Sequence, residues 1–147
     1  MNKIRLALVT YFLMFTPNLV SACDSLELLG GWVKNPLPGT NYTAAYFSIK
    51  NNKEKSQNIN NFSSADFANV MIHTSEKNND LTKMKHLKSL QIPPNQIIKA
   101  EPGGIHLMLK VKPESTFKIT QLVLFSAYCE SGDIWQFSLP IKNPSSN

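Results

Sequence analysis

All three histidines of this 147-residue chain and three of its five methionines fall between residues 71 and 108. They form three pairs in which one residue separates an imidazole from a thioether: Met71 and His73, Met84 and His86, and His106 and Met108. In a β-strand, residues i and i+2 point to the same face. If these segments are strands, each pair presents a nitrogen and a sulfur donor side by side. The pattern predicts a pocket for a soft metal where the strands meet.

The donor types indicate which metal. Thioether and imidazole together suit Cu(I), whereas Zn²⁺ sites use cysteine, histidine and carboxylate, and Ca²⁺ and Mg²⁺ prefer oxygen. A thioether also avoids the oxidation to disulfide that would disable a thiolate ligand in an oxidising compartment. Taken singly, a strand methionine is more often core filler and a surface histidine is usually solvated. The clustering in alternating pairs is what favours a Cu(I) site.

Short apolar segments separated by turn clusters must position these side chains. Runs of four to thirteen residues that are rich in β-branched and aromatic types predict strands at residues 26–34, 43–50, 69–74, 81–87, 97–101, 104–110, 116–128 and 134–141. Proline, glycine and asparagine clusters lie between them. Residues 77–90 fit either a helix or a strand. About eight short strands with no internal linker predict a single all-β domain, an antiparallel β-sandwich over residues 23–147 with a polar tail.

Composition excludes several functional classes. The chain is 42% apolar, with 15 Lys and Arg against 10 Asp and Glu, which is ordinary for a globular protein. Arg5 is its only arginine, and the lysines are scattered among acids, which argues against nucleic-acid binding. No serine-histidine-aspartate arrangement, H-E-x-x-H run or phosphate-binding glycine loop is present, so we do not expect an enzyme.

The N-terminus has the layout of a secretory signal peptide over residues 1–22. A basic start, Met1 to Arg5, precedes the apolar run from Leu6 to Phe15 and a small-residue segment that ends at Ala22. The apolar run is short for a membrane-spanning helix. We therefore expect export to the periplasm.

The two cysteines, Cys23 and Cys129, have two interpretations. Ordinary cleavage after Ala22 would leave them to form a disulfide in an oxidising compartment. The segment from Val20 to Cys23 also fits a bacterial lipobox, in which Cys23 would carry a lipid and attach the protein to a membrane. The Pro17-Asn18 break before the site favours ordinary cleavage, but both interpretations stay open on the sequence.

The spacing of four donors resembles a known family signature. His73 is followed by ten residues and Met84, then by twenty-one residues and His106-x-Met108, which gives H-x10-M-x21-H-x-M. This resembles the motif of the periplasmic copper chaperone family PCuAC, and the similarity extends over most of the chain after Cys23. The resemblance implies a cupredoxin-like Greek-key sandwich that binds Cu(I) through His73, Met84, His106 and Met108. Met71 and His86 lie outside the motif. Two roles stay open for them, auxiliary or transient ligation and packing or solvent exposure, and the second is expected for each.

The resemblance also implies what the protein does. In this interpretation it is a monomeric periplasmic chaperone that passes Cu(I) to an acceptor, such as the cytochrome c oxidase subunit that holds the binuclear copper centre. The C-terminal tail has no histidine or methionine, so no second copper site is expected there. Two alternatives are a blue-copper electron-transfer protein, which would need a thiolate ligand, and a structural lipoprotein without a metal, which would leave the clustering unexplained.

Overall fold

The computed structural model describes residues 22–78 and 81–143. Within them the regular structure consists of ten β-strands and one short 3-10 helix, η1 (Ala22–Ser25), so the predicted all-β class is confirmed. The predicted signal peptide lies outside the described residues, apart from Ala22. In the part of the chain that the structure describes, no helix has the length and apolar character that a membrane crossing requires.

The strands follow one another along the chain with short connections. They are β1 (Leu26–Lys34), β2 (Tyr42–Asn51), β3 (Gln57–Ser63), β4 (Phe67–Asn78), β5 (Leu81–His86), β6 (Leu90–Ile92), β7 (Ile97–Ala100), β8 (Ile105–Val111), β9 (Leu122–Cys129) and β10 (Ile134–Lys142).

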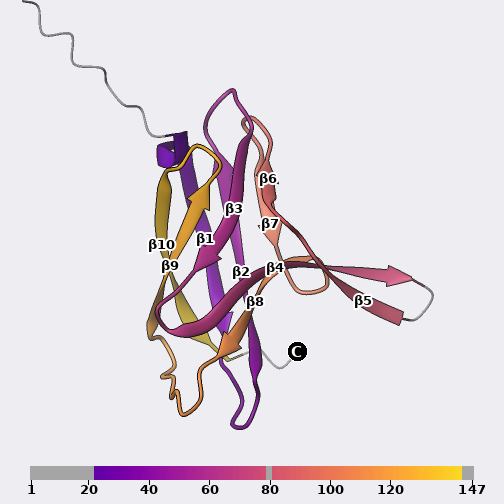
Figure 1. Cartoon of the computed structure of the whole chain (residues 1–147), viewed down its shortest axis with the longest axis vertical. Helices are drawn as coiled ribbons and strands as arrows, with labels where there is room; N and C mark the ends of the chain where they lie inside the picture. The colour runs from indigo at the N-terminus through magenta and orange to yellow at the C-terminus, as the bar shows by residue number, and fades with distance from the viewer. Residues whose placement is uncertain (1–21, 79–80, 144–147) are drawn as a thin grey trace, which may run out of the picture.

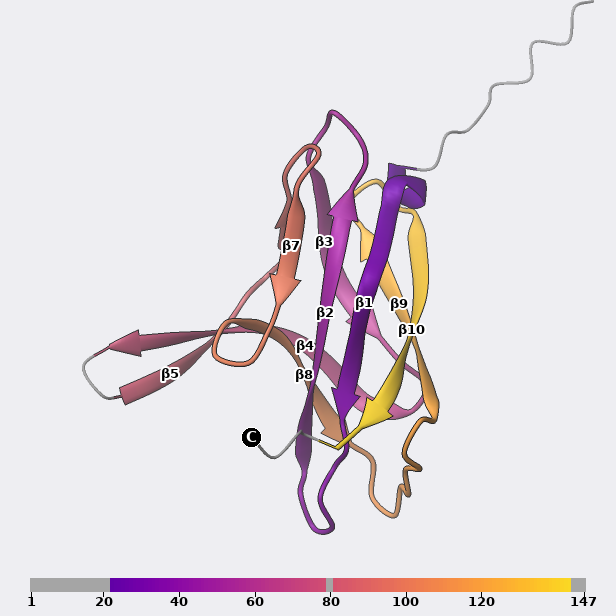
Figure 2. The same ribbon diagram turned by 180° about the vertical axis from the view of Figure 1, so that it is seen from behind.

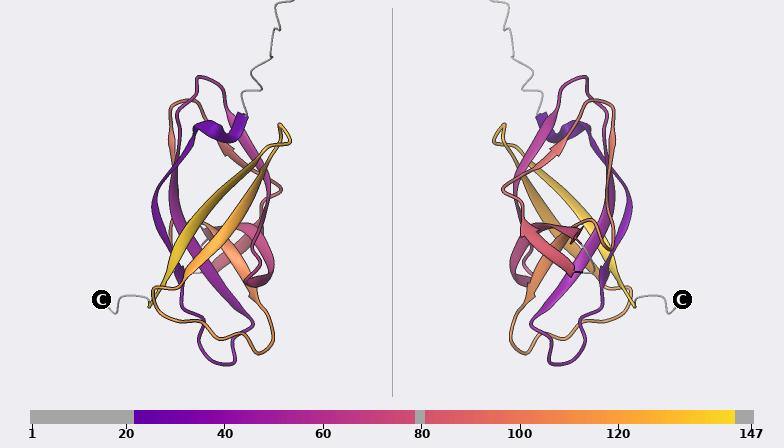
Figure 3. Two further views of the ribbon diagram at one scale, coloured as in Figure 1. Left: turned by 90° about the vertical axis from the view of Figure 1, so that its left-hand side faces the viewer. Right: turned by 90° about the vertical axis from the view of Figure 1, so that its right-hand side faces the viewer.

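The strands form a curled sheet that folds over on itself. One half has the order β5-β4-β8-β2-β1, with β7 also paired to β2, and the other half has the order β10-β9-β3-β6. The halves join where β1 and β10 run parallel, with Val33 opposite Ile141 and Lys34 opposite Lys142. Figure 1 and the reverse view in Figure 2 show the long strands side by side, and Figure 3 shows the β9–β10 layer crossing the other strands at an angle.

The core lies between the two layers and follows the period-two alternation of the strands. Along β2, every second residue from Thr43 to Asn51 is buried, as expected for a strand with one face toward the core. Phenylalanine rings from both layers meet there, with centroids 5.8 Å apart for Phe47 and Phe137 and 6.2 Å apart for Phe47 and Phe62. This packing leaves the opposite face of β2, β4 and β8 available for polar and metal-binding side chains.

Two strands were not predicted, and one begins later than predicted. Asparagine-rich β3 buries only Gln57, Ile59 and Phe62, and a β-bulge after Ile59 interrupts the alternation that would have revealed it. β6 has only three residues. Residues 116–121 form a connection, so β9 begins at Leu122 instead of residue 116. The sandwich therefore has ten strands instead of about eight, and the β1–β10 contact departs from an entirely antiparallel arrangement.

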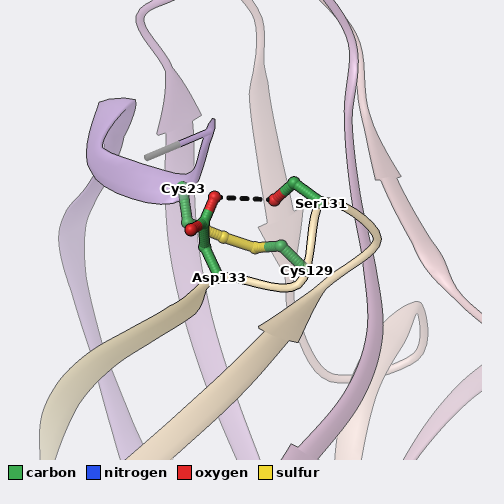
Figure 4. The surroundings of a disulfide bond; sticks show 4 residues. All are labelled: Cys23, Cys129, Ser131 and Asp133. Atoms are coloured by element: carbon green, nitrogen blue, oxygen red, sulfur yellow. Dashed lines mark hydrogen bonds between the residues drawn. A yellow bond between two sulfur atoms is a disulfide. The ribbon is translucent and has the colours of Figure 1, made fainter. Parts of the chain in front are cut away.

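Cys23 and Cys129 form a disulfide at the end of the sandwich where η1 lies. Their Cα atoms are 6.5 Å apart, and Cys23 is 1% exposed. Figure 4 shows the bond beneath η1, beside the β9–β10 turn, in which the Ser131 hydroxyl donates a hydrogen bond to the Asp133 carboxylate at 2.8 Å. A disulfide and a lipid would need the same Cys23 sulfur, so the structure supports the disulfide interpretation.

The end of β4 and the whole of β5 project sideways from the sandwich as a hairpin (Figures 1 and 2). Six residue pairs hold it together, from His73 opposite His86 to Asn78 opposite Leu81. β5 is the terminal strand of its half of the sheet. The segment that was ambiguous between helix and strand is thus largely β-hairpin, and it carries Met84 and His86.

Candidate metal centre

The strand register brings the predicted donors to one face of the sheet. In antiparallel strands, residues directly opposite one another share a face. His73 on β4 lies opposite His106 on β8, and Met108 lies opposite both Met71 and Ala44. On β5, Met84 lies opposite Ser75, two residues along β4 from His73. The three histidines and the three methionines between residues 71 and 108 therefore share this face, while Leu107 and Leu109 of β8 point into the core at 0% exposure.

A cavity of about 300 Å³ opens on this face. Met84, His106 and Met108 line it, together with Tyr46, Ser75 and the start of β2. Lys34 is its only charged lining residue, and no carboxylate lines it. A site with uncharged donors and no acid suits a monovalent soft ion better than Zn²⁺ or Ca²⁺. His73 lies one strand away from His106, beside the cavity instead of in its lining.

The turn before β8 holds His106 in a fixed orientation. β7 and β8 pair with successive parts of the same edge of β2, so the four residues between them must bulge outward, and Gly103 permits this with a φ of 84°. The Gly104 carbonyl oxygen lies 3.0 Å from Nδ1 of His106. Because a carbonyl can only accept, Nδ1 carries the hydrogen, and Nε2 of the neutral ring keeps its lone pair for a metal.

The candidate site contains a buried ring nitrogen that makes no hydrogen bond, on His73. Among the described residues, its Nδ1 is the one buried side-chain nitrogen or oxygen with no hydrogen-bond partner. Leaving a buried polar atom unpaired costs about 1–3 kcal/mol. The His73 ring stacks near the His106 ring, with centroids 6.1 Å apart. A metal ion bound at this nitrogen would offset that cost.

The surroundings of His73 favour the neutral form of its imidazole ring. Burial lowers the pKa of the His73 imidazole below its usual value, and the neighbouring His86 and His106 rings lower it further. A lower pKa means that the neutral, metal-binding form persists to more acidic pH. Burial also raises the pKa of the Tyr46 phenol, so this cavity-lining group stays uncharged at neutral pH.

Met108 and Met84 differ in how firmly the fold holds them. Met108 is half-buried in the central strand β8, between β2 and β4. Met84 is 63% exposed on the projecting hairpin. The candidate site therefore combines two donors from a central strand, His106 and Met108, with a thioether from a hairpin that is open to solvent.

His86 and Met71 lie closer to the predicted site than their positions outside the motif suggest. The His86 ring lies 5.3 Å from the His73 ring, edge-on, and is exposed as expected. Met71 is half-buried opposite Met108. Period-two alternation places Met71 on the same face as His73, as the sequence predicts, but no sequence signal reveals that His86 lies directly across from His73.

The three histidines do not form a metal site by themselves. Across residues 22–78 and 81–143, no group of three or more His, Cys, Asp or Glu side chains converges to hold a metal ion. His86 and His106 flank His73 on either side, two strand spacings or about 9.5 Å apart, so a metal here could be shared by two of the imidazoles, with thioethers as further donors. Such a mixed nitrogen and sulfur donor set is suited to Cu(I).

The lowered pKa of His73 predicts a pH effect that can be measured on the metal-free protein. In an NMR titration, the His73 ring should protonate at a pH below the ordinary histidine value of about 6.5. Because the unfolded chain then binds this proton more readily than the folded chain, the free energy of unfolding should fall as the pH drops through about 6.5 toward the folded-state pKa. His86→Ala removes one repulsive neighbour and should raise the pKa of His73, though burial keeps it below the ordinary value. A wild-type midpoint at or above the ordinary value would contradict this.

Comparisons with known proteins identify a matching family and a shared fold. The profile of the family described as putative lipoprotein LpqE-like matches residues 26–124. The apo PCuAC domain from PmoF1 has 21% identity and a TM-score of 0.67, over 82% of this chain and 95% of that domain. The copper-bound PCuAC domain from PmoF2 has 18% identity and the same TM-score, over 82% and 94%.

A further similar structure is that of CuI-DR1885 from Deinococcus radiodurans, with 19% identity and a TM-score of 0.67 over 86% of this chain and 83% of that one. No curated protein matches the chain. At these identities the likeness of the solved structures establishes a shared fold, the cupredoxin-like sandwich that the sequence predicted.

Proposed function

Because this chain belongs to the LpqE-like (PCuAC) family, we propose that it is a periplasmic Cu(I) chaperone that binds the ion through His73, Met84, His106 and Met108. The main support for this proposal is that Nδ1 of His73 is buried and has no hydrogen-bond partner. Next to it lies the ring of His106, whose tautomer is fixed by the contact between its Nδ1 and the Gly104 carbonyl. In this proposal Cu(I) is cargo that is bound and released unchanged, so the protein is a carrier instead of an enzyme.

The ring spacing supports a shared ion. With a metal–nitrogen bond of about 2.0 Å, as in other metal–imidazole sites, a ring centroid lies about 3 Å from the metal, so two rings on one ion have centroids about 5–6.5 Å apart. The His73 and His106 centroids, at 6.1 Å, fall in this range. Met108 shares the strand face of His106, and Met84 lines the same cavity.

The similar structures give independent support for the cargo. One similar domain, from PmoF2, is copper-bound, and DR1885 was solved with Cu(I). Met84, exposed on the hairpin, places one thioether of the proposed ligand set at the solvent-facing side of the site. We propose that the acceptor is a protein of oxidase assembly, such as the subunit with the binuclear copper centre, and that the protein acts as a monomer.

A blue-copper function has less support. Such a site needs a cysteine thiolate, but Cys129 is in a disulfide with Cys23. That disulfide lies beside η1 at the start of β1, whereas Lys34, at the other end of β1, lines the cavity (Figures 1 and 2). No thiolate is thus available near the histidines.

The proposal predicts one tightly bound Cu(I) per chain and no intense visible absorption when Cu(II) is added. The four donors form one site, and no thiolate is present to give the charge-transfer band of blue copper. Competition of the purified protein against a chromogenic Cu(I) chelator measures the first quantity, and absorption spectroscopy the second. Failure to bind Cu(I) would refute the proposal. Two tight equivalents would show an additional site, and a strong visible band would favour electron transfer.

A further inference from the structure

The three imidazoles form a row across three adjacent strands, with His73 in the middle. His73 on β4 lies opposite His86 on β5 and opposite His106 on β8. The ring centroids are 5.3 Å apart for His73 and His86 and 6.1 Å apart for His73 and His106. Both separations suit two imidazoles that share one ion, about 5–6.5 Å by the same bond lengths as above.

The row cannot hold an ion with all three rings at once. His86 and His106 lie on the two strands that flank β4, two strand spacings or about 9.5 Å apart, which is farther than two rings on one ion. An ion bound to His73 can therefore also bind His106 or His86, but not both at once. His73 is common to both arrangements, so an ion could exchange one neighbour for the other without leaving the protein.

The His86 side has the features of a second position for a soft ion. His86 and Met71 line a separate hollow of about 340 Å³, whose other lining residues are asparagines, apolar residues and one charged residue, Lys88. The hollow thus has an imidazole and a thioether of its own, beside the shared His73. His86 is exposed, whereas His106 is 6% exposed. This second position is the more accessible of the two.

We propose that His86 and Met71, with the shared His73, form a transient Cu(I) position through which the ion enters and leaves the main site. This rests on the proposed function. In the transfer step, bonds form from copper to a ring nitrogen of His86 and to the sulfur of Met71, and the bonds to Met84, His106 and Met108 break. The His73 bond persists and copper stays Cu(I), so no electron or proton needs to be supplied. Because His73 belongs to both positions, the chain still holds one ion.

The kinetics of copper exchange test this proposal. We expect His86→Leu to slow both the uptake and the release of Cu(I) by about tenfold, the lower end of the loss seen when a supporting residue is removed at metal sites. The equilibrium affinity should stay unchanged, because loss of a transient binding position slows the uptake and the release of Cu(I) by the same factor. Stopped-flow mixing of the loaded full chain with a chromogenic Cu(I) chelator measures release, and mixing of the empty chain with a chelated Cu(I) donor measures uptake.

A second variant distinguishes the loss of a copper-binding atom at position 86 from a change in the shape of the side chain. Leucine and methionine have similar volumes, so His86→Met should restore most of the wild-type rate if a donor atom is what matters. Wild-type rates in His86→Leu, or equal rates in the leucine and methionine variants, would overturn the proposal. So would an affinity loss as large as that of His106→Ala, because His86 would then be a permanent ligand. If the wild-type chain binds no Cu(I), the proposed function itself fails.

Discussion

Met108→Leu is expected to lower the Cu(I) affinity by at least about 100-fold, because loss of a ligand should cost no less than the 10–100-fold typical of residues that only support one. Leucine fills nearly the same volume as methionine but has no donor atom. His106→Ala should reduce the affinity further, because it removes the imidazole that the Gly104 carbonyl orients. Both side chains lie on the face opposite the core, so the fold should persist.

Competition against a Cu(I) chelator measures these affinities, and circular dichroism checks folding. Met71→Leu is the matched control, because Met71 lies directly opposite Met108 on the same face and is outside the proposed main ligand set. It should leave the affinity unchanged, as should His86→Ala. Abolished binding in His86→Ala, or wild-type affinity in His106→Ala and Met108→Leu, would refute the ligand assignment.

Reduction of the Cys23–Cys129 disulfide is expected to lower the free energy of unfolding by about 2–5 kcal/mol. The bond joins residues separated by 106 positions, so opening it greatly increases the conformational entropy of the unfolded chain in the chain-entropy model. For a domain of this size, that loss corresponds to a fall in melting temperature of about 10 °C or more.

Chemical denaturation of the protein with and without a thiol reductant measures this effect, and the Cys23→Ala/Cys129→Ala double variant checks that the reductant has no other target. Mass spectrometry of the exported protein should show the chain two hydrogens lighter than its reduced form, without a lipid. A diacylglyceryl mass on Cys23 would contradict the disulfide, and an unchanged stability on reduction would contradict its structural role.

The sequence predicts strands well where one face alone is apolar. β2 is extended by only one residue at each end of its predicted range, because its alternation of buried and exposed residues is regular. β1 has the predicted bounds of residues 26–34, although a β-bulge between Leu28 and Gly30 interrupts its alternation. β3 escapes prediction because its buried positions include Gln57 and its bulge shifts the period. A polar strand of this kind is specified by its partners, β9 and β6, and not by its own residues.

The candidate site was predictable in composition but not in detail. The motif spacing selects four donors, and alternation places His106 and Met108 on one face. The pairing of His73 with both His86 and His106 depends on the register of three strands, which no local pattern encodes. The hydrogen bond from His106 to Gly104 likewise depends on how β7 and β8 share the edge of β2.

The position of the disulfide in the chain determines what a single proteolytic cut does to the protein. The covalent loop from Cys23 to Cys129 encloses every strand from β1 to β8 and ends with the last residue of β9. A protease that cuts the backbone once inside this loop, for example beside the exposed Lys83 or Lys85 of the projecting hairpin, leaves two pieces that remain one covalent molecule. A nick between His73 and Met84 therefore does not release either half, and the clipped protein separates on a gel only after its sulfurs are reduced.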